Sequence, residues 1–262
     1  MKKITVSVLL CVFLWSIFVG CSDDDVKKQE MILVEAGTTS AANGSVTVEN
    51  DFYIGKYYVT QTEFEEVMGF NPSYFNAQDH PDLTGNTANR PVEQVSWYDA
   101  IMFCNKLSER EGLGNYYTIS DIKYDGNNII DAGVIKNDLA SGYRLPTPEE
   151  WEYAARGGKD GEATRYAGSD NINEVSWFIR NSMAANSSKE YNRGTMPVGE
   201  KEPNELGLYD MSGNVIDWTN SIVDSKCILW GGSYTGPAVF HVIELEPSAR
   251  YSHVGFRPVR IR

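Results

Sequence analysis

The sequence predicts an α+β fold that is rich in loops and limited in regular secondary structure. Its 262 residues include 23 glycines and 12% aromatic residues, a composition that favours irregular segments held by large rings over long helices. The apolar runs typical of strands are short, as at 31–34 and 52–54. No internal repeat or domain boundary is visible after residue 30, so we expect 31–262 to form one domain.

Residues 1–20 have the pattern of a secretory signal peptide. Two lysines precede an apolar run over 4–19 that is too short for a membrane span. The Gly20-Cys21 junction resembles a bacterial lipobox, which predicts that Cys21 carries a lipid; the alternative is a plain secretory signal in which Cys21 is incidental. Residues 21–30 form an acidic and polar tether, in which the Ser-Asp-Asp-Asp segment 22–25 resembles the surface-export tag of Bacteroidetes lipoproteins. We therefore expect a protein that is lipid-anchored in the cell envelope, at the outer membrane and facing outward.

Three helices are predicted from their N-terminal caps. Each begins with a Ser or Thr that is followed three residues later by an acidic residue, the pattern of a capping box. The three pairs are Thr60 with Glu63, Ser96 with Asp99, and Thr147 with Glu150. We expect these helices to end near Gly69, at Gly112 and at 157–158, where glycine permits the left-handed conformation that closes a helix.

The remaining elements are strands and long loops. Residues 116–135 alternate loosely around an Asp-Gly-Asn turn and predict a β-arm. Further strands are expected at 228–234, where glycines permit close backbone approach, and at 254–260 as a closing strand. Residues 71–89 and 157–205 are mostly loop. Bound ions and packed rings are one way to hold loops of this length.

The segment 207–218 carries two carboxylates, Asp210 and Asp217, on either side of a Gly-Asn turn. A sharp turn can direct backbone carbonyls towards one point, and carboxylates with carbonyls are the ligands that calcium prefers. From the residues alone, an Asx-type turn before a buried aromatic residue is the stronger interpretation.

Charge and cysteine content narrow the function classes. A formal net charge of −13 argues against a nucleic-acid partner, because phosphates require an excess of Lys and Arg. Once Cys11 leaves with the signal peptide and Cys21 is lipidated, Cys104 and Cys227 remain, without the spacing of a metal site. They can pair as a disulfide or remain two buried thiols, and the apolar helical face around Cys104 favours the second.

Several stretches together resemble the formylglycine-generating enzyme family, also called the sulfatase-modifying factor domain. They occur in the family's order over nearly the whole mature chain, at 58–64, 91–97, 144–158, 197–199, 207–218, 230–233 and 255–257. The resemblance implies the family's variant of the C-type-lectin-like α+β fold, with structural calcium. The family's calcium motif falls on Asp210, Gly213, Val215 and Asp217, the first and last through side chains and the middle two through carbonyls. A second family calcium site would fall near 175–176, where no carboxylate pattern matches.

The same resemblance implies an activity that this chain is not expected to retain. Active members oxidise a cysteine of a sulfatase to formylglycine, using oxygen and copper(I) held by two thiolates. Copper(I) prefers sulfur ligands, yet the two thiolate positions fall on Gly236 and His241. Cys227 lies upstream of the strand's glycines and is a poor substitute. A related iron-dependent branch of the family uses a histidine cluster, whereas His80, His241 and His253 are widely spaced.

Two functional hypotheses follow from this pattern. The first is a lipid-anchored, calcium-stabilised binding or envelope-assembly module without copper, in which a groove lined by Trp230, Tyr234, Phe240 and Arg250 takes a protein, peptide or glycan ligand. For Trp230 alone, a place in the core is the simpler interpretation. The second is a divergent oxidase that converts a cysteine of exported sulfatases to formylglycine.

Overall fold

The computed structural model describes residues 30–41, 44–81, 83, 86–182, 194–239 and 241–262. The predicted signal peptide, Cys21, all of the tether but Glu30, and Phe240 lie outside the described residues. Within the described part of the chain, no helix is long and apolar enough to span a bilayer.

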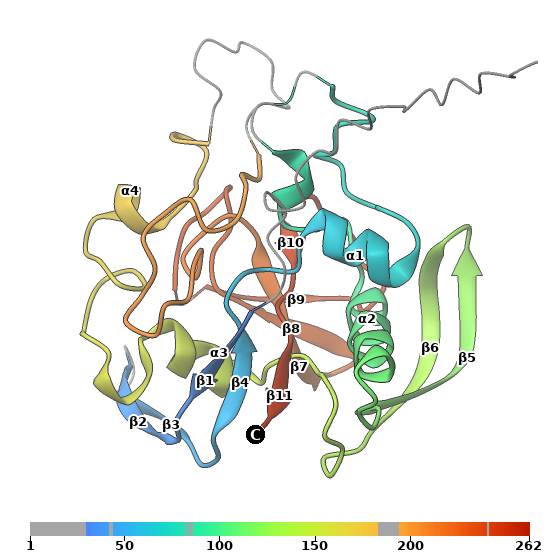
Figure 1. The fold of residues 1–262 in the computed structure, drawn as a ribbon, viewed down its shortest axis with the longest axis horizontal. Helices are drawn as coiled ribbons and strands as arrows, with labels where there is room; N and C mark the ends of the chain where they lie inside the picture. The colour runs from blue at the N-terminus through green and yellow to red at the C-terminus, as the bar shows by residue number, and fades with distance from the viewer. Residues whose placement is uncertain (1–29, 42–43, 82, 84–85, 183–193, 240) are drawn as a thin grey trace, which may run out of the picture.

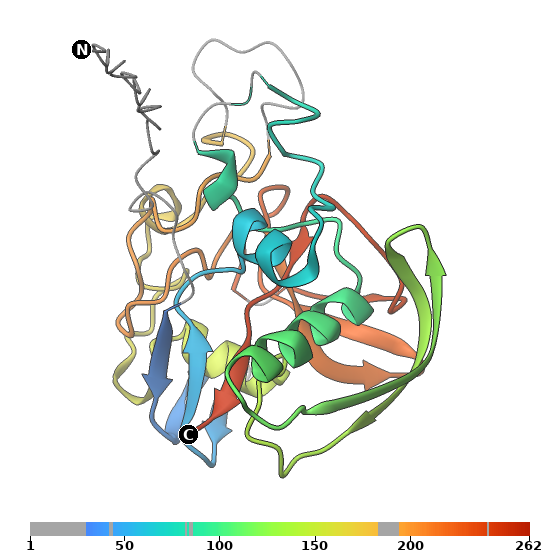
Figure 2. The ribbon, with the colours of Figure 1, turned by 45° about the vertical axis from the view of Figure 1, so that its right-hand side comes forward.

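Two sheets form the frame of the molecule (Figure 1). The first is antiparallel and has the order β1 (Met31–Val34), β4 (Phe52–Gly55), β11 (Val259–Ile261). The second has the order β10 (Val254–Gly255), β7 (Ile216–Val223), β8 (Lys226–Trp230), β9 (Val242–Leu245), and only the β10–β7 pair is parallel. Two separate hairpins pair β2 (Gly37–Ala41) with β3 (Gly44–Val48), and β5 (Tyr117–Asp125) with β6 (Asn128–Lys136). The second hairpin is the predicted β-arm, and it curves along α2 (Figure 2).

The predicted helices form with the predicted caps. They are α1 (Gln61–Met68), α2 (Trp97–Arg110) and α3 (Pro148–Ala155), followed by one turn of helix at α4 (Ile172–Val175). Short 3₁₀ turns lie at Thr87–Asn89 and Gly158–Asp160. The Thr60 side chain accepts the Glu63 N–H at 3.2 Å, and the second and third helices each begin with a complete reciprocal capping box.

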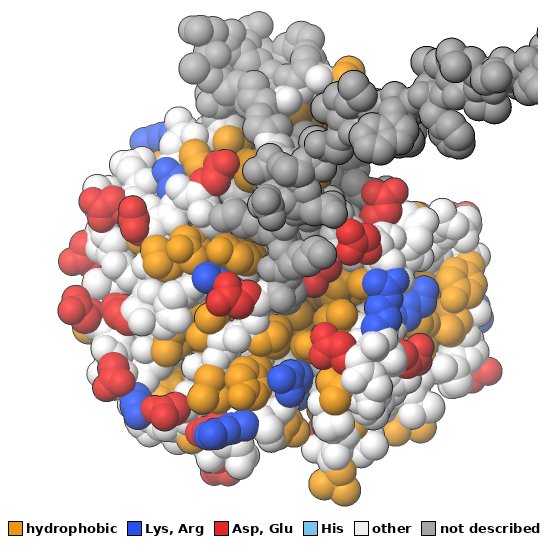
Figure 3. Space-filling view, in the orientation of Figure 1, with side chains coloured by type: hydrophobic (Ala, Val, Ile, Leu, Met, Phe, Trp, Pro, Cys, Tyr) orange, Lys and Arg blue, Asp and Glu red, His pale blue; other side chains and the backbone are white. Residues whose placement is uncertain are grey.

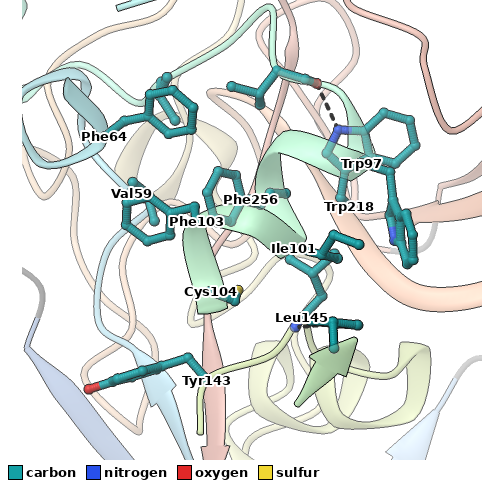
Figure 4. Close-up of a cluster of buried hydrophobic side chains, with 14 of the residues drawn as sticks. Val59, Phe64, Trp97, Ile101, Phe103, Cys104, Tyr143, Leu145, Trp218 and Phe256 are labelled. Atoms are coloured by element: carbon teal, nitrogen blue, oxygen red, sulfur yellow. Dashed lines mark hydrogen bonds between the residues drawn. The ribbon is translucent and has the colours of Figure 1, made fainter. Parts of the chain in front are cut away.

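The main core lies where α1 and α2 cover the second sheet. Phe64, Phe103 and Phe256 gather there, with Phe64 and Phe103 stacked at 5.7 Å between ring centroids and Phe256 meeting both edge-on. Trp97 and Trp218 lie beside them (Figure 4). Each indole also donates a hydrogen bond to a backbone carbonyl, Trp97 to Thr219 O and Trp218 to Val95 O, both at 2.9 Å. These buried rings therefore fix backbone positions as well as burying apolar area.

The closing strand differs from its prediction, because it is two short strands in different sheets. β10 pairs with β7, whereas β11 pairs with β4. Pro258 lies between them and has no N–H to continue a ladder. The chain therefore leaves one sheet and enters the other through residues 256–258, which places Arg257 between the two sheets.

Candidate functional site

The segment 207–218 is a strained turn that leads into β7. Two of its residues that are not glycine, Asp210 and Asn214, have φ of 62° and 67°, a left-handed conformation that costs free energy for residues with a side chain. At Gly213, a Cβ atom would stand 2.2 Å from the Ser176 Oγ. The surrounding structure must therefore hold this turn in place.

Asn214 supplies much of that support. Its side-chain amide donates to the Met196 carbonyl at 2.9 Å and accepts the Met196 N–H at 3.0 Å, as a neighbouring strand would. Its backbone N–H donates to Trp177 O at 3.0 Å, and its carbonyl accepts from Tyr234 N at 2.8 Å. One buried asparagine thus joins the turn to three segments that are otherwise irregular.

The carbonyls of the turn converge on the hydroxyl of Tyr58. This hydroxyl lies 2.7 Å from Val215 O, 3.2 Å from Asp210 O and 3.4 Å from Gly213 O. Tyr58 is fully buried, and its ring packs under the Arg257 guanidinium at 4.3 Å. Three carbonyls of this turn thus face the same buried hydroxyl.

Asp217 lies at the centre of this region with no exposed surface. Its Oδ2 accepts a 2.8 Å hydrogen bond from the Trp151 indole, and its Oδ1 lies 3.8 Å from Arg257 Nε. Burial raises the pKa of Asp217 to about 6, while the Arg257 charge opposes that rise. The fully buried Arg257 also donates to Gly55 O at 3.1 Å and to Tyr209 O at 3.0 Å. Asp217 of the second sheet is therefore paired with Arg257, which also donates a hydrogen bond to β4 of the first sheet.

All donor atoms of the predicted calcium motif are oxygens, which suits a hard cation. Asp210 is buried, and its Oδ2 accepts the Gly199 N–H at 2.9 Å. Among the described residues, the buried Oδ1 of Asp217 has no hydrogen-bond partner, and Arg257 Nε lies 3.8 Å from it. The Tyr58 hydroxyl and the Arg257 guanidinium approach the same oxygens, so the chain also offers internal partners for them. The donor atoms are thus of the type that calcium prefers, and Tyr58 and Arg257 compete with an ion for them.

The two positions that the family resemblance assigns to copper ligands hold no thiol. Gly236 has no side chain and lies in an exposed turn closed by its bridge to Ser233, and His241 is exposed. Cys104 and Cys227 are free thiols in the core, as predicted, and burial raises the pKa of both well above the ordinary value. Among the described residues, no group of three or more His, Cys, Asp or Glu side chains is placed to hold a metal.

The groove candidates have different surroundings. Trp230 is partly buried and packs against a second cluster of buried residues, which includes Phe52, Ile54 and Trp151. This place in the core agrees with its simpler interpretation. Tyr234 is 8% exposed and is held by Phe75 edge-on at 5.6 Å and by the Ser252 hydroxyl at 3.1 Å. Arg250 pairs with Asp99 at 2.5 Å and lines a hollow near the β-arm.

Sequence reasoning did not assign roles to Tyr58, Glu93 and Arg257, although all three fall within the family-like stretches. Glu93 has no exposed surface, and its Oε1 accepts the Phe75 N–H at 2.8 Å. Burial raises the pKa of Glu93 to about 8, although backbone N–H groups and the Arg90 charge oppose the rise. A buried carboxylate of this kind fixes the loop that contains Phe75.

Comparison with known proteins places these features in a family. Residues 21–262 match the family described as "Sulfatase-modifying factor enzyme 1-like domain". "Chaperone protein LppX" of Paenibacillus barcinonensis is 41% identical over 214 residues, which cover 75% of this chain and 73% of that protein. "Inactive C-alpha-formylglycine-generating enzyme 2" of Bos taurus is 38% identical over 81 residues, 30% of this chain and 27% of that protein.

Among solved structures, "Treponema denticola variable protein 1" superposes with a TM-score of 0.72 at 30% identity. The match covers 89% of this chain and 95% of that one. The predicted α+β fold of the formylglycine-generating enzyme type is therefore confirmed.

Replacing Arg257 with Met is expected to lower the free energy of unfolding by about 3–5 kcal/mol, because it leaves Asp217 buried without its charge partner. Urea unfolding followed by tryptophan fluorescence measures this loss. Arg262→Met is the matched control: Arg262 also pairs with an aspartate, Asp51 at 2.7 Å, but in solvent, where ion pairs contribute little. Equal losses in the two variants would contradict the role given to Arg257.

Glu93 predicts a pH dependence of stability. A carboxyl group whose pKa rises from 4.5 to about 8 on folding contributes stability below pH 4.5 that is lost as the pH approaches 8. Relative to wild type, Glu93→Gln should therefore gain about 1 kcal/mol per pH unit over that window. Urea unfolding at pH 5, 6, 7 and 8 measures the difference, and a difference that stays constant with pH would refute the assignment.

Proposed function

Because the chain belongs to the sulfatase-modifying factor enzyme 1-like domain family, we propose that it is a lipid-anchored, non-catalytic member that binds exported proteins and assists their folding or assembly in the cell envelope. The proposal includes a lipid on Cys21 and a calcium ion at the turn 207–218. Relatives of this chain are named as a chaperone in one case and as an inactive enzyme in another, and both names are compatible with a non-catalytic role.

The observation that carries this proposal is the replacement of both copper-ligand positions by Gly236 and His241. Glycine offers no ligand atom, and a single imidazole does not reproduce a pair of thiolates for a soft ion. The two remaining thiols are buried and are held in their protonated forms. A scaffold with these residues keeps its shape and its surfaces, while its described residues do not offer the pair of thiolates that the oxidation uses.

The β-arm offers a surface suited to unfolded clients. Ile130 and Ile135 of β6 are 46% and 70% exposed, and Leu139 just beyond the arm is 96% exposed. Apolar side chains are visible at the right-hand edge of the surface, over the arm, while carboxylates are scattered across the face (Figure 3). Exposed apolar residues that gather into a contiguous patch commonly mark sites of protein contact, and the net negative charge of the chain keeps such a surface soluble.

A client assay tests the binding function. The full-length chain in detergent is added in equimolar amount to a secreted α-amylase unfolded in guanidinium, and light scattering and recovered amylase activity are followed after dilution. We expect scattering to fall at least twofold and recovery to rise, relative to serum albumin. The double variant Ile135→Ser, Leu139→Ser should lose most of this effect, whereas Val223→Ser, at an exposed residue of β7, should retain it. No effect of the wild-type chain on either readout would refute the function.

The alternative function is the family's oxidase activity, and a direct assay separates the two. The full-length chain is incubated with copper(I), oxygen and a cysteine-containing sulfatase peptide, and aldehyde is detected by mass spectrometry. We expect no aldehyde above a protein-free control. Aldehyde that forms with the wild-type chain and disappears with Cys227→Ser would establish the oxidase instead.

Calcium is the remaining part of the proposal. It would be held by the side chains of Asp210 and Asp217 and the carbonyls of Gly213 and Val215, where its charge would balance the two buried carboxylates. A ligand present at a hundredfold excess over its dissociation constant stabilises a protein by about 2.7 kcal/mol. Chelation should therefore lower the melting temperature, and added calcium should restore it.

Asp210→Asn provides the matched variant for that measurement, since it preserves the shape of the side chain and removes one charge. Its melting temperature should respond less to chelator and to calcium than that of the wild type. A wild-type melting temperature that ignores chelation would mean that Tyr58 and Arg257 are sufficient partners for the turn.

A further inference from the structure

A hollow of about 500 Å³, lined by polar and apolar side chains alike, lies between the loop after α1 and the turn of the β-arm. Both segments border the upper right of the molecule (Figures 1 and 2). The residues that line this hollow include Tyr74, Asp79, Gln94, Asp125, Asn127 and Arg250. Its size is that of a small-molecule site.

The charges at the hollow exclude an anionic ligand. Arg250 is bound by Asp99 at 2.5 Å, and it also donates to the carbonyls of Gln94 at 3.0 Å and Ile129 at 3.3 Å. The positive charge of Arg250 is therefore neutralised by a partner within the protein. The exposed carboxylates of Asp79 and Asp125 also line the hollow. One oxygen of Asp79 accepts from Asn76 Nδ2 at 2.7 Å, and the other oxygens accept hydrogen bonds from a ligand but repel a negative one.

Gln94 is held in a conformation that its residue type disfavours. Its φ is 58°, a left-handed value suited to glycine. The backbone is fixed on both sides, because its N–H donates to Tyr251 O at 3.1 Å and its carbonyl accepts from Arg250. Strain at a site-lining residue is a recognised mark of function, and Gln94 is one of the residues that line the hollow.

Tyr74 provides a rigid aromatic surface at the same place. Its side chain is 44% exposed, yet its ring meets Phe75 at 5.0 Å and His80 at 4.6 Å, both edge-to-face. The adjacent backbone is fixed by the hydrogen bond from Phe75 N to the buried Glu93. The ring is therefore ordered before any ligand arrives, which lowers the entropic cost of binding.

We propose that this hollow binds a neutral saccharide of one to three sugar units. Side-chain amides such as those of Gln94 and Asn127 both donate and accept, which matches sugar hydroxyls, and the two carboxylates accept from hydroxyls. The face of Tyr74 suits the C–H face of a pyranose ring. This site is separate from the exposed aliphatic residues of the arm, so it does not depend on the client-binding proposal.

The test uses the full-length chain in detergent on a printed array of neutral, sialylated and sulfated oligosaccharides, followed by calorimetry with the strongest neutral binder. We expect neutral glycans to bind and acidic glycans to bind at least tenfold more weakly. Tyr74→Ala and Gln94→Gly should each weaken binding at least tenfold. Gln94→Gly is the sharper variant, because glycine relieves the strain, so its melting temperature should equal or exceed that of the wild type while binding falls.

Tyr251→Ala is the matched control, since Tyr251 is 46% exposed and does not line the hollow; it should bind like the wild type. The proposal is overturned if no neutral glycan on the array binds, if acidic glycans bind more tightly, or if Tyr74→Ala and Gln94→Gly bind as well as the wild type.

Discussion

The buried pair of Asp217 and Arg257 is the interaction on which the rest of the structure depends. Asp217 belongs to β7 in the four-stranded sheet, and Arg257 lies where the chain crosses to the three-stranded sheet. Trp151 of α3 and Tyr58 before α1 complete the contacts. Removing ions from water is costly unless their hydrogen bonds are also satisfied. The hydrogen bonds that this pair makes come from three separate segments, which contain Gly55, Trp151 and Tyr209, so the pair forms only when the whole domain is assembled.

A similar principle explains how so much irregular chain is held in one conformation. Loops cannot satisfy their own backbone groups as helices and strands do, and here asparagine side chains take over that role. Asn214 pairs with Met196 in the manner of a strand. Asn204 donates to the carbonyl of Ala154 at the end of α3 and accepts the N–H groups of Leu206 and Leu208. Each of these asparagines thus joins two segments through a single side chain.

The sequence predicted best what is encoded locally. The capped helices and the β-arm follow from neighbouring residues, and the inward turn at 207–218 follows from its own glycine and aspartates together with the family resemblance. The β2–β3 hairpin was not predicted, because its strands contain mainly Gly, Ser, Thr and Ala and lack a strong apolar alternation. The split of the final strand depends on which sheet each half joins, and that is a long-range choice. The role of Arg257 likewise requires knowing that Asp217 lies beside it.

The placement of β1 has a mechanical consequence. The first strand begins at Met31, directly after the segment that precedes the domain, and it lies along β4 over four paired residues. Glu30 adds a backbone hydrogen bond and an ion pair to Lys56, both at 2.7 Å. A pulling force that enters along this strand loads these bonds in shear, so that they must break together and not one after another. Under the proposed anchoring through Cys21, tension would therefore act on hydrogen bonds that share the load.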